Sequence, residues 1–132
     1  MIKTIKLQDA VSNDTSANTY LKDAKEYWNS HGFTGSSNCF IYKLTTNEGQ
    51  AFAFVRDDKK TKNVHLSRFV SESKAKGIGS QMIKHLKDKY TSITAWSKGE
   101  VIPFYVKNNF EIQYDSKNEF GYFYCVWDKE KR

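Results

Sequence analysis

Residues 64–90 read VHLSRFVSESKAKGIGSQMIKHLKDKY, and the spacing of their apolar side chains changes halfway. In Val64–Val70 the aliphatic and aromatic residues predict a strand that is buried on at least one side. From Ile78 to Tyr90 the apolar residues recur at helical spacing, which predicts an amphipathic helix. The middle of the chain is therefore expected to run from a strand through a glycine turn into a helix.

The turn between these two elements carries two glycines, Gly77 and Gly79. Glycine lets the backbone turn tightly and brings its N–H groups close to a ligand. The first N–H groups of the helix have no partner within it, and the helix dipole adds positive charge, so a phosphate fits this end. A plain strand-to-helix turn is the simpler interpretation of a lone G-x-G. The stretch is neither a dinucleotide-binding fingerprint nor a Walker loop.

Two separate motifs lie in order along the chain. The first is KAKGIGS, from Lys74 to Ser80, and it follows the apolar strand end Phe69-Val70. The second is FYVKNNF, from Phe104 to Phe110. Together they resemble the coenzyme A loop, Gln/Arg-x-x-Gly-x-Gly/Ala, and the helix ending, Phe-Tyr-x-x-x-Gly-Phe, of the GNAT superfamily of N-acetyltransferases. The resemblance spans most of the chain and is weakest before residue 36.

This resemblance implies acetyl-coenzyme A as co-substrate, no metal, and a gap where the strand before the loop and the next strand splay apart. The pantetheine amides would complete the opened backbone like an added strand. Main-chain N–H groups of the glycine loop would hold the pyrophosphate, with Ser80 able to add a hydroxyl. The residues expected to contact the cofactor are Phe69, Val70, Lys74, Ala75, Lys76, Gly77, Ile78, Gly79, Ser80 and Phe104.

Tyr105 matches the family tyrosine that protonates the departing thiolate. A phenol with a pKa near 10 can serve as that acid when it lies within hydrogen-bond reach. A core tyrosine is the alternative for the same position. The base is open: His65 on the central strand is one candidate, a structural histidine is another, and many family members use water.

The sequence departs from the family motifs at three positions. Lys74 replaces Gln or Arg, which keeps a donor but loses the planar fork of arginine. Asn109 replaces glycine at the helix end, where a left-handed residue is expected and Asn is the commonest choice after glycine. Lys98 lies near the usual Asn ahead of this helix. These departures give weight to a second function, a non-catalytic module that binds coenzyme A or a partner.

The remaining patterns predict an α+β fold, or three-layer α/β, with a mixed and mostly antiparallel sheet of about six to seven strands, splayed at its centre and flanked by helices. An amphipathic helix is expected over Ala17–Trp28, and Pro103 fits the first turn of a later helix. Expected strands are Ile2–Leu7, Asn38–Thr45, Gln50–Arg56, Val64–Val70, Ser92–Trp96, Phe110–Tyr114 and Phe120–Trp127.

The composition predicts one folded domain, residues 1–132, without disulfide or metal support. No apolar run is long enough to span a membrane and no secretory segment is recognisable, so a cytoplasmic protein is expected. Six basic and two acidic residues fall between positions 63 and 90, so this stretch holds +4 of the net charge of +6. That excess fits capture of a phosphate-bearing cofactor, a solvated lysine face, or nucleic acid, which is the weaker alternative.

The function expected from these observations is transfer of an acetyl group from acetyl-coenzyme A to a primary amine of a small molecule or a protein. The acceptor groove would come from the least patterned segments, and Trp28, Trp96 and Tyr122 are aromatic candidates for its lining, although core packing is the more common fate of such residues. The acceptor itself is not readable from the sequence. A homodimer is open, because exposed final strands often pair.

Overall fold

A computed structural model describes residues 2–6, 39–47, 49–58, 60–71 and 77–131. Its strands form one seven-stranded mixed sheet in the order β1-β2-β3-β4-β5-β7-β6. The strands are β1 (Ile2–Lys6), β2 (Cys39–Thr46), β3 (Gly49–Asp58), β4 (Asn63–Ser71), β5 (Ser92–Lys98), β6 (Glu111–Gln113) and β7 (Tyr122–Asp128). Every pairing is antiparallel except that of β4 with β5. The α+β class and the mixed, mostly antiparallel sheet expected from the sequence are confirmed.

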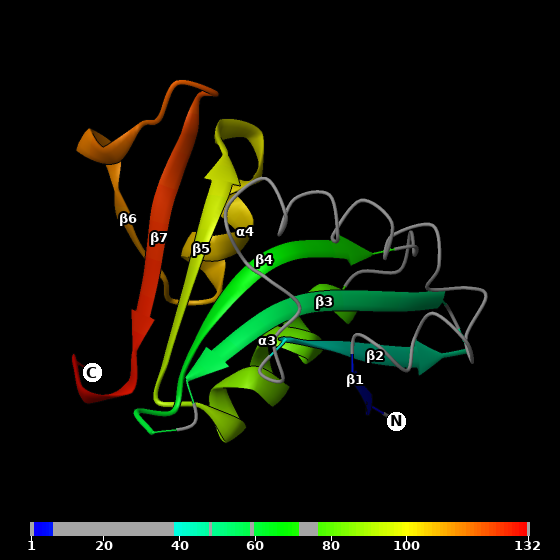
Figure 1. Cartoon of the computed structure of the whole chain (residues 1–132). Helices are drawn as coiled ribbons and strands as arrows, with labels where there is room; N and C mark the ends of the chain where they lie inside the picture. The colour runs from blue at the N-terminus through cyan, green and yellow to red at the C-terminus, as the bar shows by residue number, and fades with distance from the viewer. Residues whose placement is uncertain (1, 7–38, 48, 59, 72–76, 132) are drawn as a thin grey trace.

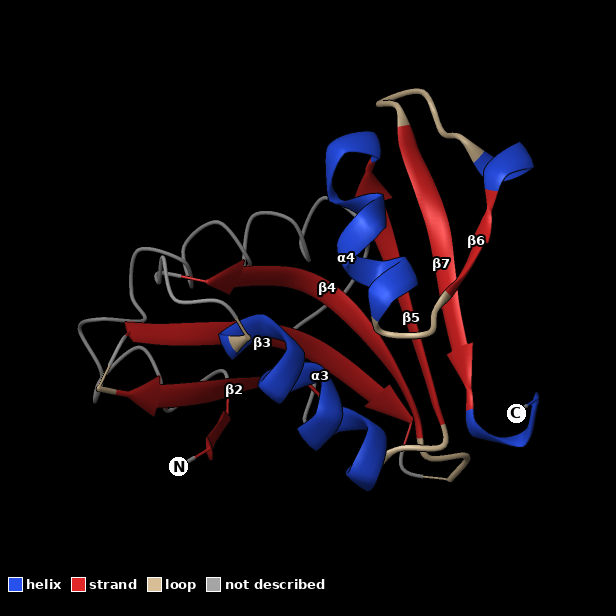
Figure 2. Cartoon of the chain, turned by 180° about the vertical axis from the view of Figure 1, so that it is seen from behind, coloured by secondary structure: helices blue, strands red, loops and turns tan. Residues whose placement is uncertain are grey.

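The two α-helices of the described residues lie on the same face of this sheet, as Figure 2 shows. They are α3 (Ile78–Lys89) and α4 (Ile102–Lys107), and the latter follows the short 3₁₀ turn η1 (Gly99–Val101). Two further 3₁₀ turns, η2 (Tyr114–Ser116) and η3 (Lys129–Lys131), follow β6 and β7. Pro103 lies in the first turn of α4, where a missing N–H costs nothing. The helix expected over Ala17–Trp28 lies outside the described residues.

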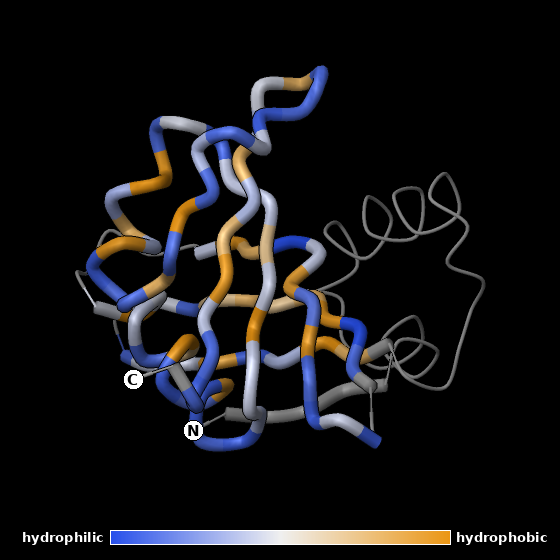
Figure 3. The backbone as a smooth tube through the Cα atoms, turned by 90° about the vertical axis from the view of Figure 1, so that its left-hand side faces the viewer, coloured by the Kyte–Doolittle hydropathy of each residue, from blue (hydrophilic) through white to orange (hydrophobic). Residues whose placement is uncertain are grey.

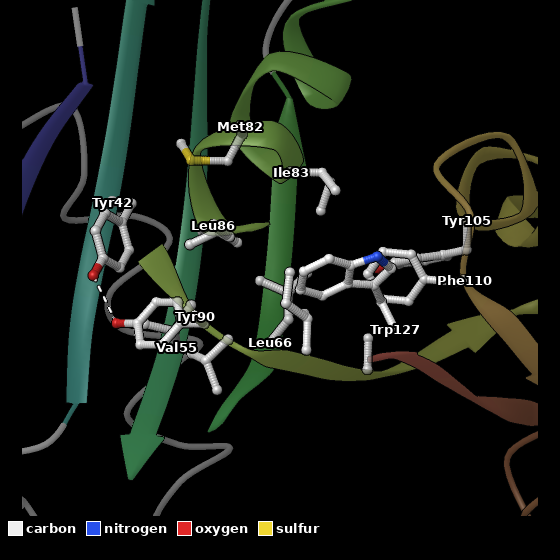
Figure 4. Close-up of a cluster of buried hydrophobic side chains, with 14 of the residues drawn as sticks. Tyr42, Val55, Leu66, Met82, Ile83, Leu86, Tyr90, Tyr105, Phe110 and Trp127 are labelled. Carbon is white, nitrogen blue, oxygen red and sulfur yellow. Dashed lines mark hydrogen bonds between the residues drawn. The ribbon is translucent and has the colours of Figure 1, made fainter. Parts of the chain in front are cut away.

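The core fills the space between the sheet and these helices (Figure 4). Met82, Ile83 and Leu86 of α3 are fully buried there against Val55 of β3 and Leu66 of β4. Figure 3 shows the hydrophobic stretches of the chain running through the middle of the strands. The helical spacing of α3 and the alternation of the strands therefore meet in one apolar layer, which is the arrangement that the periodicities predict.

The C-terminal end of α3 is fastened to the sheet by three polar side chains. Tyr90 donates from its hydroxyl to Asp57 Oδ2 at 2.9 Å, and the hydroxyls of Tyr90 and Tyr42 are 2.7 Å apart. Because the Tyr90 proton goes to Asp57, Tyr42 is the donor to Tyr90. Burial raises the pKa of Tyr90 well above its usual value. This chain of hydroxyls gives both tyrosines hydrogen-bond partners in the core.

Two residues that were predicted to begin strands lie outside them. Phe120, expected to open the last strand, is 72% exposed and lies before Gly121, whose φ of 81° makes a turn. The strand begins at Tyr122 because an extended ladder cannot continue through a left-handed residue. Phe110, expected to begin β6, is instead buried in the core just before that strand.

Candidate active site

The strands β4 and β5 diverge from each other halfway along their length (Figure 1). Their parallel pairing joins Asn63–Leu66 to Ser92–Ala95, and beyond it β4 continues to Ser71 while β5 continues to Lys98. In this second half β5 stays paired with β7 and β4 stays paired with β3. The sheet therefore splits into two halves at its centre, and the facing backbone edges of β4 and β5 no longer bond to each other.

A bulge in β4 sits at the point where the strands divide. Leu66 faces Val55 of β3, but the next facing pair is Arg68 with Phe54, so β4 has one residue more than β3 at this step. An extra residue bends a strand and increases its twist. The bulge thus accounts for the turn of β4 away from β5.

The helix α3 begins at this divided part of the sheet. Gly77 precedes it with a φ of 101°, a backbone conformation that favours glycine, and its carbonyl accepts from Gln81 N at 2.9 Å. The first turn contains no acidic residue. The N–H groups of Ile78, Gly79 and Ser80 belong to the turn that has no partners within the helix. The predicted loop residues Lys74, Ala75 and Lys76 lie outside the described residues.

Gly79 is tightly packed against aromatic rings. A Cβ at this position would lie 3.0 Å from Phe104 Cε1 and 3.5 Å from Phe69 Cε1. The rings of Phe69 and Phe104 are 5.8 Å apart at their centroids and pack on the core cluster. A side chain at position 79 would therefore need the Phe104 ring to shift by a few tenths of an ångström, so the close contact between α3 and α4 favours glycine here, in addition to any approach of a ligand to its backbone.

Ser80 and Asn108 link the two helices through a polar contact. Asn108 Nδ2 lies 3.2 Å from Ser80 Oγ and 2.8 Å from the carbonyl oxygen of Phe104. Lys87 Nζ donates to the backbone carbonyl of Asn108 and lies 5.2 Å from the centroid of the Trp127 ring. The sequence predicted none of these contacts, because nothing in the pattern of residues 104–110 indicates that the side chain of Asn108 is half-buried.

Tyr105 projects from α4 into the core beside Phe110 and Trp127 (Figure 4). It is 4% exposed, and its ring centroid lies 5.3 Å from that of Phe104. No described residue hydrogen-bonds to its hydroxyl. Burial, and after it the Cys125 thiol on β7, raise the pKa of Tyr105 above its ordinary value. The phenol is thus held in its protonated, acid form at neutral pH.

The end of α4 explains the spacing of the second motif. Phe110 N donates to Tyr105 O at 2.9 Å and Asn109 N donates to Val106 O at 3.0 Å, which together make a Schellman motif. Asn109 takes the left-handed conformation, φ 67°, as its place in the motif predicts. The rings of Tyr105 and Phe110 pack edge to face with centroids 5.1 Å apart. The tyrosine, the left-handed residue and the phenylalanine thus form one helix cap.

His65 lies on β4 before the split, on the face opposite the core cluster of α3. Its Nδ1 is 2.8 Å from Thr94 Oγ1 on β5. Burial, with the nearby Arg56 guanidinium as the smaller cause, lowers the pKa of His65 to about 4. The imidazole is therefore neutral at pH 7 and a weak acceptor for the proton of an amine. Its geometry favours a structural role.

Of the three aromatic residues considered for an acceptor groove, the structure describes two, Trp96 and Tyr122. Trp96 is 37% exposed on β5 and its ring centroid is 4.9 Å from that of Tyr124 on β7. Tyr122 is half-buried at the start of β7. Trp28 lies outside the described residues.

The described part of the chain has neither a metal-binding cluster nor a membrane-spanning helix. The described His, Cys, Asp and Glu residues form no group of three or more that could hold a metal ion. None of the described helices has the length and apolar character needed to cross a membrane.

The fold is that of the GNAT superfamily of N-acetyltransferases, so the resemblance carried by the two motifs is confirmed at the level of the fold. No protein-family model matches the sequence, and no curated protein matches it. The likeness therefore lies in the structure.

Three solved structures show this likeness over nearly the whole chain. An acyl-CoA N-acyltransferase from Pseudomonas aeruginosa has a TM-score of 0.63 at 12% identity, covering 96% of this chain and 98% of that one. A protein assigned to the GNAT acetyltransferase family from Desulfovibrio desulfuricans has a TM-score of 0.61 at 14% identity, covering 98% of both chains. The N-acetyltransferase YlbP of Bacillus subtilis, solved in complex with coenzyme A, has a TM-score of 0.54 at 13% identity, again covering 98% of both.

Proposed function

We propose that this protein is an acetyl-coenzyme A-dependent N-acetyltransferase that transfers an acetyl group to a primary amine of a small molecule or a protein by direct attack on the thioester. The observation that carries the proposal is the separation of β4 from β5 beyond Leu66 and Ala95, beside the first turn of α3. This arrangement sets an opened backbone edge next to a helix end that favours anions.

The cofactor would lie along this edge with its diphosphate at α3. Successive residues of a strand turn their N–H and C=O groups to opposite sides, so one of Phe69 and Val70 faces β3 and the other offers its backbone to the pantetheine amides. The amides of Gly77, Ile78, Gly79 and Ser80 would hold the diphosphate, because the first turn of α3 brings no competing carboxylate. Lys74, Ala75 and Lys76 would complete that loop, with two positive charges.

The chemistry needs an unprotonated amine, an oriented thioester and a proton for the leaving thiolate. A carbon–nitrogen bond forms at the acetyl carbonyl as the carbon–sulfur bond breaks. Tyr105 would donate its hydroxyl proton to the sulfur. Its raised pKa keeps that proton in place up to alkaline pH and at the same time makes the phenol a weaker acid. The amine proton would leave to water, since His65 is a weak base here.

A second candidate is a non-catalytic module that keeps the coenzyme A site or only the fold. The observation that favours it is the deep burial of Tyr105, whose ring already serves the end of α4 by packing on Phe110. A tyrosine in that position does not need to be an acid. The departures at Lys74 and Lys98 point the same way.

Binding and turnover separate the two candidates. The purified protein is titrated with coenzyme A by calorimetry, then incubated with acetyl-coenzyme A and a panel of polyamines, amino acids and lysine-containing peptides. The proposal predicts binding together with thiol release and an acetylated product for at least one amine. Binding without transfer to any amine would favour the module that keeps the coenzyme A site. The absence of binding would overturn the transferase and leave only the module that keeps the fold.

A further inference from the structure

Asn108 makes two side-chain hydrogen bonds, one within the end of α4 and one that joins α4 to α3. Its side-chain nitrogen donates to the carbonyl oxygen of Phe104 at 2.8 Å, four residues back in α4, and reaches Ser80 Oγ at 3.2 Å in the first turn of α3. The second contact spans 28 residues of sequence. The first is a local helix-end bond, but the second connects the proposed diphosphate end of the site with the helix that carries Tyr105.

The proton positions in this contact follow from the chemistry of the groups. A carbonyl oxygen only accepts hydrogen bonds, so the atom facing Phe104 O must be the NH₂ of Asn108 and not its amide oxygen. Each of the two hydrogens of that NH₂ then has an acceptor, the first on Phe104 and the second on Ser80. Ser80 Oγ therefore accepts from Asn108, and its own single hydrogen is left to be donated elsewhere.

The backbone of Asn108 is held as firmly as its side chain. Lys87 Nζ, from the last turn of α3, donates to the Asn108 carbonyl. The packing of Phe104 against Gly79 supplies a further contact between the same two helices. Asn108 is thus fixed from both ends of α3, and its NH₂ group is presented to Ser80 in one orientation.

We propose that Asn108 is a positioning residue, which turns the Ser80 hydroxyl into a dedicated donor to the diphosphate and locks the tyrosine helix to the diphosphate end of the site. This inference rests on the proposed function. Its physical basis is that a hydroxyl held as an acceptor by one neighbour has its proton ready for an anion, with no reorganisation when the anion arrives. The binding free energy of the diphosphate, which lies far from the reacting atoms, thereby helps to hold α4 and its Tyr105 in position.

Two substitutions of Asn108 test this role against that of a simple helix end. Asn108→Leu keeps the shape but donates nothing, so the Ser80 hydroxyl loses its orientation. Asn108→Asp keeps the shape and replaces the donor by an acceptor, which draws the Ser80 proton to itself and adds a negative charge beside the anion. We expect the affinity for coenzyme A to fall about tenfold for Leu and about a hundredfold for Asp.

The probes are coenzyme A and pantetheine, titrated by NMR chemical shifts into each folded variant. Pantetheine has no phosphate, so its Kd is expected to stay within about twofold of the wild-type value in both variants. The ratio of the two Kd values then reports the nucleotide part of coenzyme A, which includes the diphosphate. In a Ser80→Ala background, Asn108→Leu should cause no further loss of coenzyme A affinity, because the group it positions is gone. Asn109→Gly is the matched control, since it changes the neighbouring residue and keeps the left-handed helix end; it should bind like wild type.

The outcomes separate this inference from the proposed function. Failure of the wild-type protein to bind coenzyme A would overturn both. If wild type binds, but the Asn108 variants lose coenzyme A and pantetheine equally, or add their loss to that of Ser80→Ala, Asn108 is a structural helix end and only this inference is overturned. Should Asn108→Leu fail to fold, Asn108→Ala takes its place in the same measurements.

Discussion

Removal of the Tyr105 hydroxyl should separate the catalytic role of this residue from its structural role. The ring is 4% exposed, packs on Phe110 at 5.1 Å and on Phe104 at 5.3 Å, and completes the cap of α4. Tyr105→Phe retains all of these contacts. Because no described residue hydrogen-bonds to the hydroxyl, the free energy of unfolding should change by less than about 1 kcal/mol. Tyr105→Ala, by contrast, should cost about 3–5 kcal/mol through the cavity it leaves.

The effect of Tyr105→Phe on turnover should be far larger than its effect on stability. A positioned general acid accounts for about 10² to 10⁴ in rate, so kcat should fall by about a hundredfold or more while the Kd for coenzyme A stays unchanged. Since burial raises the pKa of the Tyr105 phenol, ionisation of this group should cause no loss of wild-type rate up to about pH 10.

The assay follows thiol release from acetyl-coenzyme A between pH 6 and pH 10, alongside urea unfolding of each variant. Tyr114→Phe is the matched control, because Tyr114 is 64% exposed on η2 and should change neither readout. Wild-type turnover in Tyr105→Phe would refute the role of this phenol as the acid. A loss of stability above about 1 kcal/mol would show instead that the hydroxyl supports the fold.

Two further predictions concern packing and pH. Gly79→Ala should destabilise the protein by about 1–2 kcal/mol, because the new Cβ would lie 3.0 Å from the ring of Phe104. Adding Phe104→Leu in the same chain should recover most of that loss of unfolding free energy. Purely additive effects of the two substitutions in urea unfolding would contradict this prediction. The folded state lowers the pKa of His65 from 6.5 to about 4, so the contribution of this residue to stability is fully present above pH 6.5. On acidification the unfolded chain takes up the proton first, and the free energy of unfolding should fall by about 2–3 kcal/mol near pH 4.5. His65→Gln should flatten the dependence of unfolding free energy on pH between 7.5 and 4.5, whereas parallel curves for the two proteins would argue against the shifted pKa.

The sequence predicted the elements that depend on local periodicity. The change from strand to helix spacing between Val70 and Ile78 is a property of consecutive residues, and the structure has β4 and α3 in those places. The left-handed Asn109 was likewise predicted, because the backbone at a helix end restricts which residues fit. The strand boundary at Phe120 was wrong, since a hydrophobic residue in a turn looks like the start of a strand.

The features that depend on contacts between distant segments were not predictable in the same way. The β4 bulge had a weak signal in the two successive polar residues Ser67 and Arg68, which interrupt the alternation of the strand. The bond from Asn108 to Ser80 had none, because it requires two helices to meet at a fixed distance. Gly79 was assigned to a ligand, and the structure adds the Phe104 ring as a second reason for it.

The most direct test of the account is an NMR titration of the ¹⁵N-labelled protein with coenzyme A, read amide by amide. A cofactor between β4 and β5 predicts saturable shifts that are largest at Gly77–Ser80 and at Phe69–Val70, with little change in β1 and β6, the strands at the two outer edges of the sheet. Shifts confined to those outer strands, or no shifts at all, would contradict the placement of the cofactor between β4 and β5.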